Sequence, residues 1–123
     1  MTKRILVVED QEDNRQILRD LLSNAGYEMI EAEDGQQALT QAAKHKPDLI
    51  PMDIQLPLLD GYEATRRIKA DPALNAIPII VVTSYALSGD EEKAHAAGCD
   101  AYVAKPFSPR ALLAKIREYL PVG

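Results

Sequence analysis

The sequence predicts an α/β fold in which five strands, each followed by a helix, form a parallel sheet covered by helices on both faces. Short apolar runs alternate with segments whose apolar residues recur at helical spacing, which is the rhythm of βα units. The run at residues 5–8 is continuously apolar, as expected for a strand buried on both faces. With 123 residues, 46% of them hydrophobic and 27% charged, we expect one globular domain over residues 1–123.

The first unit begins with the strand Ile5–Val8, which ends in Glu9 and Asp10. A helix is expected over residues 13–25, where five apolar residues form one stripe. The stripe comprises Ile17, Leu18, Leu21, Leu22 and Ala25. Gly26 follows directly and suits the left-handed conformation that ends many helices.

Four further units follow at similar spacing. The expected strands are residues 27–32, 50–53, 79–82 and 101–104, and the expected helices end near residues 46, 70, 98 and 120. The residues expected to cap these helices are Asp34, Asp60, Ser88 and Ser108. The strand at 27–32 is the most polar, so we expect it at an edge of the sheet. The fourth helix has few large apolar residues, and we expect it to be the most mobile.

Pro51 lies inside the third expected strand, within the segment DLIPMDIQLPLLDG. Proline has no N–H for the ladder and is normally kept out of central strands. A central position should therefore cost about 1–3 kcal/mol unless a bulge or a water compensates. The proline leaves open how Asp53, two residues later, is placed.

Composition excludes several classes of protein. The net charge of −5 argues against a nucleic-acid-binding surface, which needs clustered Lys and Arg. Cys99 is the single cysteine, so no intramolecular disulfide forms, and we expect it to fill space in a reducing compartment. The apolar run after Arg4 is too short for a signal peptide or a membrane span. We therefore expect a cytoplasmic protein without membrane insertion.

Chemistry-bearing residues follow four of the strands. Glu9 and Asp10 end the first strand, Asp53 the third and Thr83 the fourth, and the fifth runs into Lys105. Ligand sites in open α/β sheets lie at the carboxyl ends of the strands. Carboxylates brought together there repel one another unless a cation bridges them, and oxygen ligands favour Mg²⁺.

A bound Mg²⁺ would suit phosphate chemistry. With the charge on phosphoryl oxygens neutralised, the Asp53 carboxylate can attack phosphorus as a nucleophile. Lys105 can hold another phosphoryl oxygen, and Thr83 can donate a hydrogen bond to one. The alternative for each residue alone is an ordinary polar cap on a sheet edge, which their coincidence at several strand ends disfavours.

Four segments in order carry a resemblance to a known family. They are VVED at 7–10, PDLIPMDIQLPLLDG at 47–61, VVTSYA at 81–86 and AYVAKPF at 101–107. Over its whole length the chain resembles the receiver domain of bacterial two-component response regulators. The resemblance implies a flavodoxin-like (βα)5 three-layer sandwich with strand order 2-1-3-4-5.

The resemblance also implies residue roles. Asp53 would accept a phosphoryl group from the phosphohistidine of a sensor histidine kinase or a histidine phosphotransfer protein. The Mg²⁺ ligands would be Glu9, Asp10, Asp53 and the backbone carbonyl of Gln55. Lys105 would contact the phosphoryl group, and Thr83 with Tyr102 would form a switch pair. Gln55 and Tyr85 would influence the phosphate lifetime, and the bond before Pro106 would be cis.

Signalling by such a domain needs protein partners. The resemblance implies that phosphorylation changes the surface of the fourth helix, fifth strand and fifth helix, which then binds a downstream protein or a kinase. It also allows a phosphorylation-dependent homodimer. The chain would not be an enzyme, beyond accepting the phosphoryl group and slowly losing it. A stand-alone receiver is favoured, and a receiver from a hybrid kinase or a longer regulator is the alternative.

Three rival functions fit less well. An aspartyl-phosphate hydrolase would usually carry a second acid two residues after the nucleophile, where this chain has Gln55. A flavin carrier would need a phosphate loop after the first strand, where the acidic segment at 9–13 would repel phosphate. A scaffolding receiver that is not phosphorylated would have lost an acidic or lysine position, and none is lost here.

Overall fold

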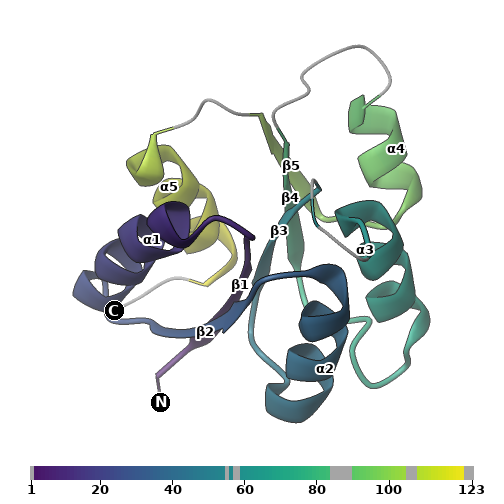
Figure 1. The fold of residues 1–123 in the computed structure, drawn as a ribbon, viewed down its shortest axis with the longest axis horizontal. Coiled ribbons are helices and arrows are strands. Elements are labelled where there is room, and N and C mark those ends of the chain that lie inside the picture. Colours follow the sequence, from purple (N-terminus) through teal and green to yellow (C-terminus); the bar gives the residue numbers. More distant parts are fainter. Residues whose placement is uncertain (1, 55, 57–58, 84–89, 105–107, 121–123) are drawn as a thin grey trace.

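The computed structural model describes residues 2–54, 56, 59–83, 90–104 and 108–120 (Figure 1). Five parallel strands form one sheet in the order β2-β1-β3-β4-β5, as predicted. The strands are β1 (Arg4–Val8), β2 (Glu28–Ala32), β3 (Ile50–Asp53), β4 (Ile79–Thr83) and β5 (Ala101–Ala104). The helices are α1 (Glu12–Asn24), α2 (Gly35–His45), α3 (Gly61–Ala70), α4 (Asp90–Ala96) and α5 (Pro109–Tyr119).

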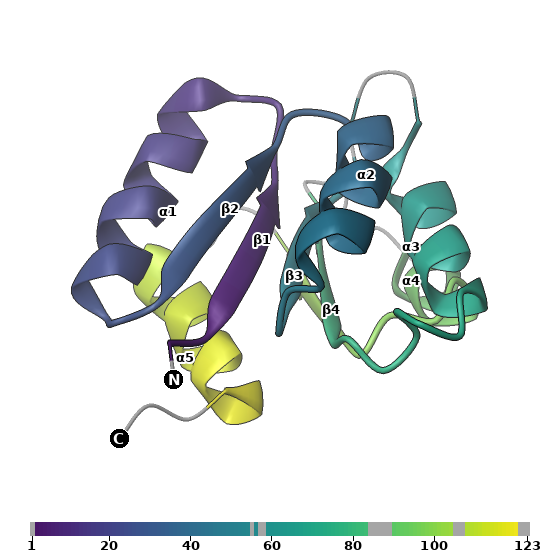
Figure 2. The ribbon, with the colours of Figure 1, turned by 90° about the horizontal axis from the view of Figure 1, so that it is seen from below.

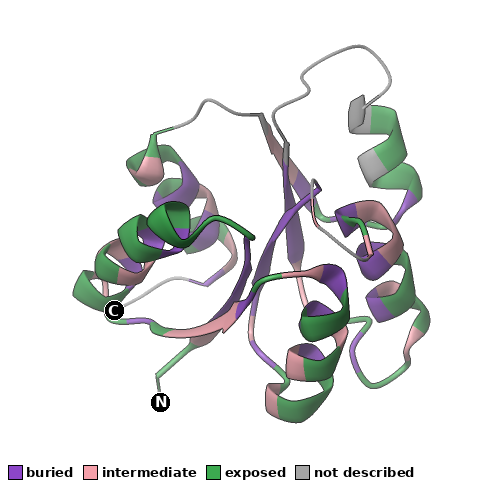
Figure 3. Ribbon diagram, in the orientation of Figure 1, coloured by how far each residue is buried: buried purple, intermediate pink, exposed green. Residues whose placement is uncertain are grey.

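Helices cover the sheet on both sides. Helices α1 and α5 lie on one face, and α2, α3 and α4 lie on the other (Figures 1 and 2). Each face has its own apolar core, built by alternate residues of the strands. The central strands between the two cores are largely buried (Figure 3). Along β3, Ile50 and Met52 belong to the core beneath α2 and α3, while Leu49, just before the strand, belongs to the core beneath α1 and α5. The predicted three-layer sandwich is confirmed.

Side-chain caps set the start of three helices. Asp34 accepts a hydrogen bond from the Gln37 N–H at 2.8 Å, and Asp60 accepts one from the Glu63 N–H at 2.9 Å. Ser108 caps α5 in the same way. These caps satisfy helix N–H groups that have no partner within the helix. The predicted cap Ser88 lies outside the described residues.

Helix α1 differs from its prediction in the face that it buries. Ile17 was expected inside, but its side chain is 50% exposed, whereas Arg15 is 5% exposed. The buried residues of α1 are Arg15, Leu18 and Leu22. These positions are three and four residues apart and therefore lie on one side of the helix. Successive residues are rotated by about 100° around the helix axis, so Ile17 lies about 100° away from its neighbour Leu18. The apolar stripe alone did not show that an arginine belongs to the buried side.

Cys99 is buried, which agrees with the space-filling role expected for it. Among the residues that the structure describes, no helix combines the length and the apolar character needed to cross a bilayer.

Pro51 lies in a central strand, since β3 is flanked by β1 and β4. On the β4 side the ladder is continuous, with Pro51 opposite Ile80 and the Ile50 N–H bonded to the Pro78 carbonyl at 2.9 Å. N–H groups of alternate residues point to opposite neighbours in a strand. The nitrogen of Pro51 therefore faces β1, and the pairing with β4 loses nothing.

The β1–β3 pairing is interrupted beside Pro51. The Leu6 N–H donates to the Leu49 carbonyl at 3.0 Å. In a regular parallel ladder the next bond runs from the N–H of residue 51 to the Leu6 carbonyl, and proline cannot supply it. The two strands are in register at Ile5 with Leu49 and again at Val8 with Met52, with no paired residues between. The structure accepts the proline by omitting one ladder bond, without a change of register.

Restoring the missing donor should stabilise the protein. Pro51→Val and Pro51→Leu each provide an N–H opposite the Leu6 carbonyl, and valine is close to proline in volume. We expect a gain of about 1 kcal/mol, the typical worth of a backbone hydrogen bond. For a domain of this size the melting temperature should rise by roughly 3–6 °C. Calorimetric melting of the parent and both variants tests this. Unchanged or lower melting temperatures for both variants would show that the missing hydrogen bond to the Leu6 carbonyl does not destabilise the parent.

Candidate functional site

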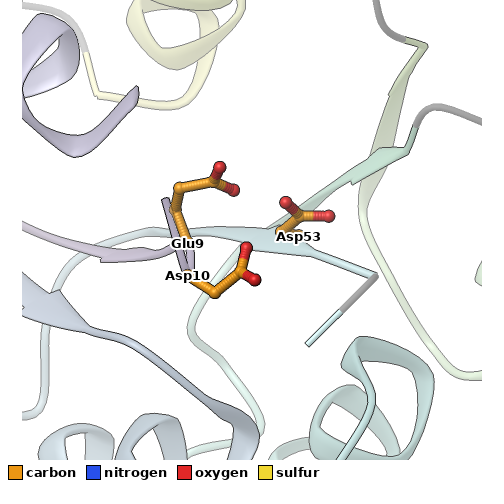
Figure 4. A group of neighbouring side chains, drawn as sticks. All are labelled: Glu9, Asp10 and Asp53. Carbon is orange, nitrogen blue, oxygen red and sulfur yellow. The ribbon is translucent and has the colours of Figure 1, made fainter. Parts of the chain in front are cut away.

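Three carboxylates meet at the carboxyl edge of the sheet. Val8 pairs with Met52, so Glu9 and Asp10, which follow β1, lie beside Asp53 at the end of β3. One carboxylate oxygen from each of the three lies within 4.8 Å of the other two (Figure 4). Glu9 and Asp53 are each 5% exposed, and Asp10 is exposed. The predicted convergence of these residues is therefore observed.

The spacing of the carboxylates suits one small cation. Oxygens bound to the same Mg²⁺ at 2.0–2.1 Å can be up to about 4.2 Å apart. The separations of at most 4.8 Å seen here would close to such distances by inward rotation of the side chains, or with one ligand acting through a water. Three carboxylates this close repel one another, and a divalent cation between them removes that repulsion.

The helix that follows β3 approaches the phosphoacceptor candidate very closely. Gly61 is buried, and a Cβ at this position would lie 2.2 Å from the Asp53 carbonyl oxygen and 2.8 Å from the Ile54 Cα. The Gly61 N–H donates to the Ile54 carbonyl at 3.0 Å. A residue without a side chain is therefore needed for α3 to begin here. The contact between the start of α3 and the end of β3 fixes the backbone at Asp53 and Ile54.

Glu9 is held at its backbone and at its side chain. Its N–H donates to the Ala32 carbonyl at 3.0 Å. Its carbonyl accepts from Arg15 Nη1 at 2.7 Å, and its carboxylate accepts from Asn14 Nδ2 at 2.6 Å. Sequence reasoning missed Asn14 and Arg15. The available signal was a charged residue at position 15 on the same side of the helix as Leu18 and Leu22.

Arg15 is itself surrounded by carboxylates. Its guanidinium bonds Glu12, Glu31 at 3.2 Å and Glu33 at 3.1 Å, in addition to the Glu9 carbonyl. The hydrogen bond from Arg15 holds the pKa of Glu12 below its usual range, although partial desolvation of that carboxylate opposes some of this effect. Arginine suits such a position because its planar fork offers five donors.

The remaining predicted residues are only partly described. Tyr102 is half-buried against the core beneath α2 and α3, and it pairs with Val81. Thr83 pairs with Ala104, two residues further along the same two strands. The backbones of the proposed switch pair are thus close in register. Lys105, Gln55, Tyr85 and Pro106 lie outside the described residues, so their predicted roles are not tested.

A family model confirms what this geometry indicates. The model of the response regulator receiver domain matches residues 5–117. The chain belongs to this family. The match includes both strands that carry the three carboxylates, and it agrees with the strand order of the sheet. The receiver domain is a signalling module of two-component regulation, as the four sequence segments predicted.

Relatives agree in length as well as in sequence. The receiver is 47% identical over 120 residues to the polar-differentiation response regulator DivK of Brucella ovis, covering 98% of both chains. It is 46% identical to DivK of Brucella anthropi, again with 98% coverage of both. Both relatives are response regulators, and the match spans nearly the whole length of each.

Solved structures share the fold throughout. The receiver domain of the sensor histidine kinase PA1611 from Pseudomonas aeruginosa superposes with a TM-score of 0.89 at 38% identity, covering 99% of this chain and 100% of that one. That structure has a magnesium ion coordinated in its active-site cleft. The chemotaxis protein CheY4 of Vibrio cholerae gives a TM-score of 0.90 at 28% identity, with 97% and 99% coverage.

The tight contact at Gly61 generates a prediction. In Gly61→Ala the new methyl group would overlap the Asp53 carbonyl, so α3 or the end of β3 must move. We expect a loss of about 1–3 kcal/mol in the free energy of unfolding, and altered NMR amide shifts at Asp53 and Ile54. Gly26→Ala is the control, because its φ of 92° makes alanine unfavourable far from this contact. It should lower stability and leave those two amide shifts in place, and the same outcome for Gly61→Ala would contradict the prediction.

Proposed function

We propose that this receiver domain accepts a phosphoryl group on Asp53 from the phosphohistidine of a sensor histidine kinase or a histidine phosphotransfer protein. The observation that carries the proposal is the position of Asp53. It is the last residue of a central strand, and its carboxylate lies within 4.8 Å of those of Glu9 and Asp10. A carboxylate among other carboxylates stays a nucleophile only where a cation offsets their charge.

The transfer is a displacement at phosphorus. An oxygen of the Asp53 carboxylate forms a bond to phosphorus while the bond from phosphorus to the donor imidazole nitrogen breaks. The product is an acyl phosphate on Asp53 and a neutral histidine on the donor after proton uptake. Later attack by water on phosphorus returns Asp53 to a carboxylate and releases inorganic phosphate. The domain therefore accepts the phosphoryl group on its own side chain and later loses it by hydrolysis.

Magnesium is the cofactor that fits the donor set. Glu9, Asp10 and Asp53 supply hard carboxylate oxygens with spacing suited to one small cation, and the backbone carbonyl of Gln55 would complete the protein ligands. The magnesium ion in the PA1611 receiver supports this choice. When bound, Mg²⁺ would neutralise charge on the phosphoryl oxygens. Hydrogen bonds hold both the carboxylate and the backbone carbonyl of Glu9, so the Glu9 side chain would need little reorganisation to bind the ion.

Two further residues would respond to the phosphoryl group. Lys105 directly follows β5 and would pair with a phosphoryl oxygen, and Thr83 at the end of β4 would donate a hydrogen bond to another. A movement of Thr83 would change the position of Tyr102 on the neighbouring strand. Tyr102 pairs with Val81, which lies two residues before Thr83 in β4. The resulting change at α4, β5 and α5 is the signal read by a partner, while Gln55 and Tyr85 would set its lifetime.

The partners and the setting follow from this role. The likeness to DivK at 98% coverage of both chains supports a stand-alone regulator that signals by protein contact. The likeness to the PA1611 receiver keeps a hybrid-kinase origin as the second candidate. We place the domain in the cytoplasm, where its lone Cys99 would stay reduced.

Acetyl phosphate tests the acceptor residue directly. With Mg²⁺ present, Asp53 displaces acetate from this small donor, and intact-mass analysis should show the addition of one phosphoryl group. Asp53→Asn should show none, and Glu63→Gln, which changes an exposed helix carboxylate, should behave as the parent protein. A parent protein that gains no mass, or an Asp53→Asn variant that gains it, would overturn the proposal.

The switch is tested in the parent protein with beryllium fluoride, which imitates a phosphoryl group on a carboxylate. Because Thr83 and Tyr102 lie on paired strands, we expect amide shifts along β4, β5 and α5. We expect much smaller shifts in β2 and α2, on the other side of β1 and β3. Equal shifts in both regions, or none in β5, would argue against a switch at this surface.

A further inference from the structure

Two neighbouring residues of α1 contact residue Glu9 from different directions. Asn14 Nδ2 reaches the Glu9 carboxylate at 2.6 Å, and Arg15 Nη1 reaches the Glu9 carbonyl at 2.7 Å. The second bond is buried and charge-assisted, which makes it one of the stronger kinds of hydrogen bond in a protein. The Glu9 N–H is held by the Ala32 carbonyl of β2. Backbone and side chain of Glu9 are thus both oriented by neighbours.

The carbonyl of Glu9 belongs to the peptide group that joins Glu9 to Asp10. A planar peptide group turns as one unit, so the bond from Arg15 also fixes the orientation of the Asp10 nitrogen and Cα, from which the Asp10 side chain extends. The Asp10 carboxylate is exposed, and among the described residues its hydrogen bond is a long one, from Gln11 Nε2 at 3.5 Å, so its orientation depends on its backbone. Arg15 therefore constrains the backbone from which two of the three carboxylates extend.

Arg15 exerts this effect through geometry. Arg15 and Arg19 share an ion network with Glu12, Glu31 and Glu33, so two cations face three carboxylates and the network has no surplus positive charge. It cannot neutralise the acidic site nearby. The surrounding carboxylates instead fix the plane of the Arg15 guanidinium, whose side chain is 6% exposed. A fixed plane holds Nη1 against the Glu9 carbonyl.

We propose that Asn14 and Arg15 are positioning residues that orient Glu9 and Asp10 for a divalent cation. The inference rests on the proposed function, because it assumes that these carboxylates bind Mg²⁺. Residues that hydrogen-bond metal ligands keep them oriented, and their loss typically weakens metal binding by about 10–100-fold. Asn14 and Arg15 would raise the affinity of the site for Mg²⁺ without touching the ion.

Asn14→Ala is the sharpest test. Asn14 is exposed and helical, and alanine favours helix more than asparagine, so the variant should fold at least as well as the parent. Gln16→Ala on the same helix is the matched control, because its amide bonds Asp20 and Arg19 instead of Glu9. Mg²⁺ titration followed by NMR should give an affinity about 10-fold weaker for Asn14→Ala and unchanged for Gln16→Ala.

Arg15→Gln and Arg19→Gln form a second matched pair. Both arginines bond Glu12 and Glu31, but only Arg15 is described in contact with Glu9. We expect a loss of at least 10-fold in Mg²⁺ affinity for Arg15→Gln and less than threefold for Arg19→Gln. The Asp10 amide shift should move in Arg15→Gln even without Mg²⁺. Arg15→Lys keeps the charge but loses the fork, and it should also bind Mg²⁺ more weakly.

Melting temperatures without Mg²⁺ separate this role from general stability. Affinities are compared at a temperature where every variant is folded. Asn14→Ala within twofold of the parent affinity, Arg15→Lys at the parent affinity, or a parent without Mg²⁺ binding would each overturn the inference. A parent that binds Mg²⁺ but gains no phosphoryl group from acetyl phosphate would overturn the proposed function and leave this inference standing.

Discussion

The parallel pairing of β1 with β3 determines where the three carboxylates meet. Because parallel strands end at the same edge of a sheet, the register of Val8 with Met52 brings Glu9 and Asp10 beside Asp53. A shift of one residue would turn Asp53 to the opposite face of the sheet. The close approach of α3 at Gly61 and the contacts of α1 with Glu9 both depend on strand ends that this register places.

The same pairing is interrupted at Pro51, so the site is supported mainly from its outer sides. On the β3 side, the Ile54 N–H bonds the Val82 carbonyl and the Gly61 N–H bonds the Ile54 carbonyl. On the β1 side, β2 and α1 hold Glu9. A missing bond between the two strands therefore leaves both strand ends anchored, which explains how a proline two residues before Asp53 is compatible with the arrangement of the carboxylates.

Charge connects this arrangement to signalling. Two of the three carboxylates are almost fully buried, and their mutual repulsion is a cost that the folded chain carries. A cation would relieve that cost, and in the proposed function it would also prepare Asp53 to meet a phosphoryl group. Rigid support for Glu9 matters because carboxylates that repel one another would otherwise turn apart. The arginine network is linked to the acidic site through the hydrogen bond from Arg15 to the Glu9 carbonyl.

The sequence by itself determined the order of the elements, most of the caps and the meeting of Glu9, Asp10 and Asp53. These depend on local patterns and on the rule that parallel strands end at one edge. It did not determine that Arg15 is buried and Ile17 exposed, because the rotation of α1 about its axis is set by packing and by ion pairs with Glu31 of β2 and with Glu33. Nor did it show how Pro51 is accommodated or why position 61 must be glycine. Those depend on which neighbour each backbone group faces, and only the tertiary structure decides that.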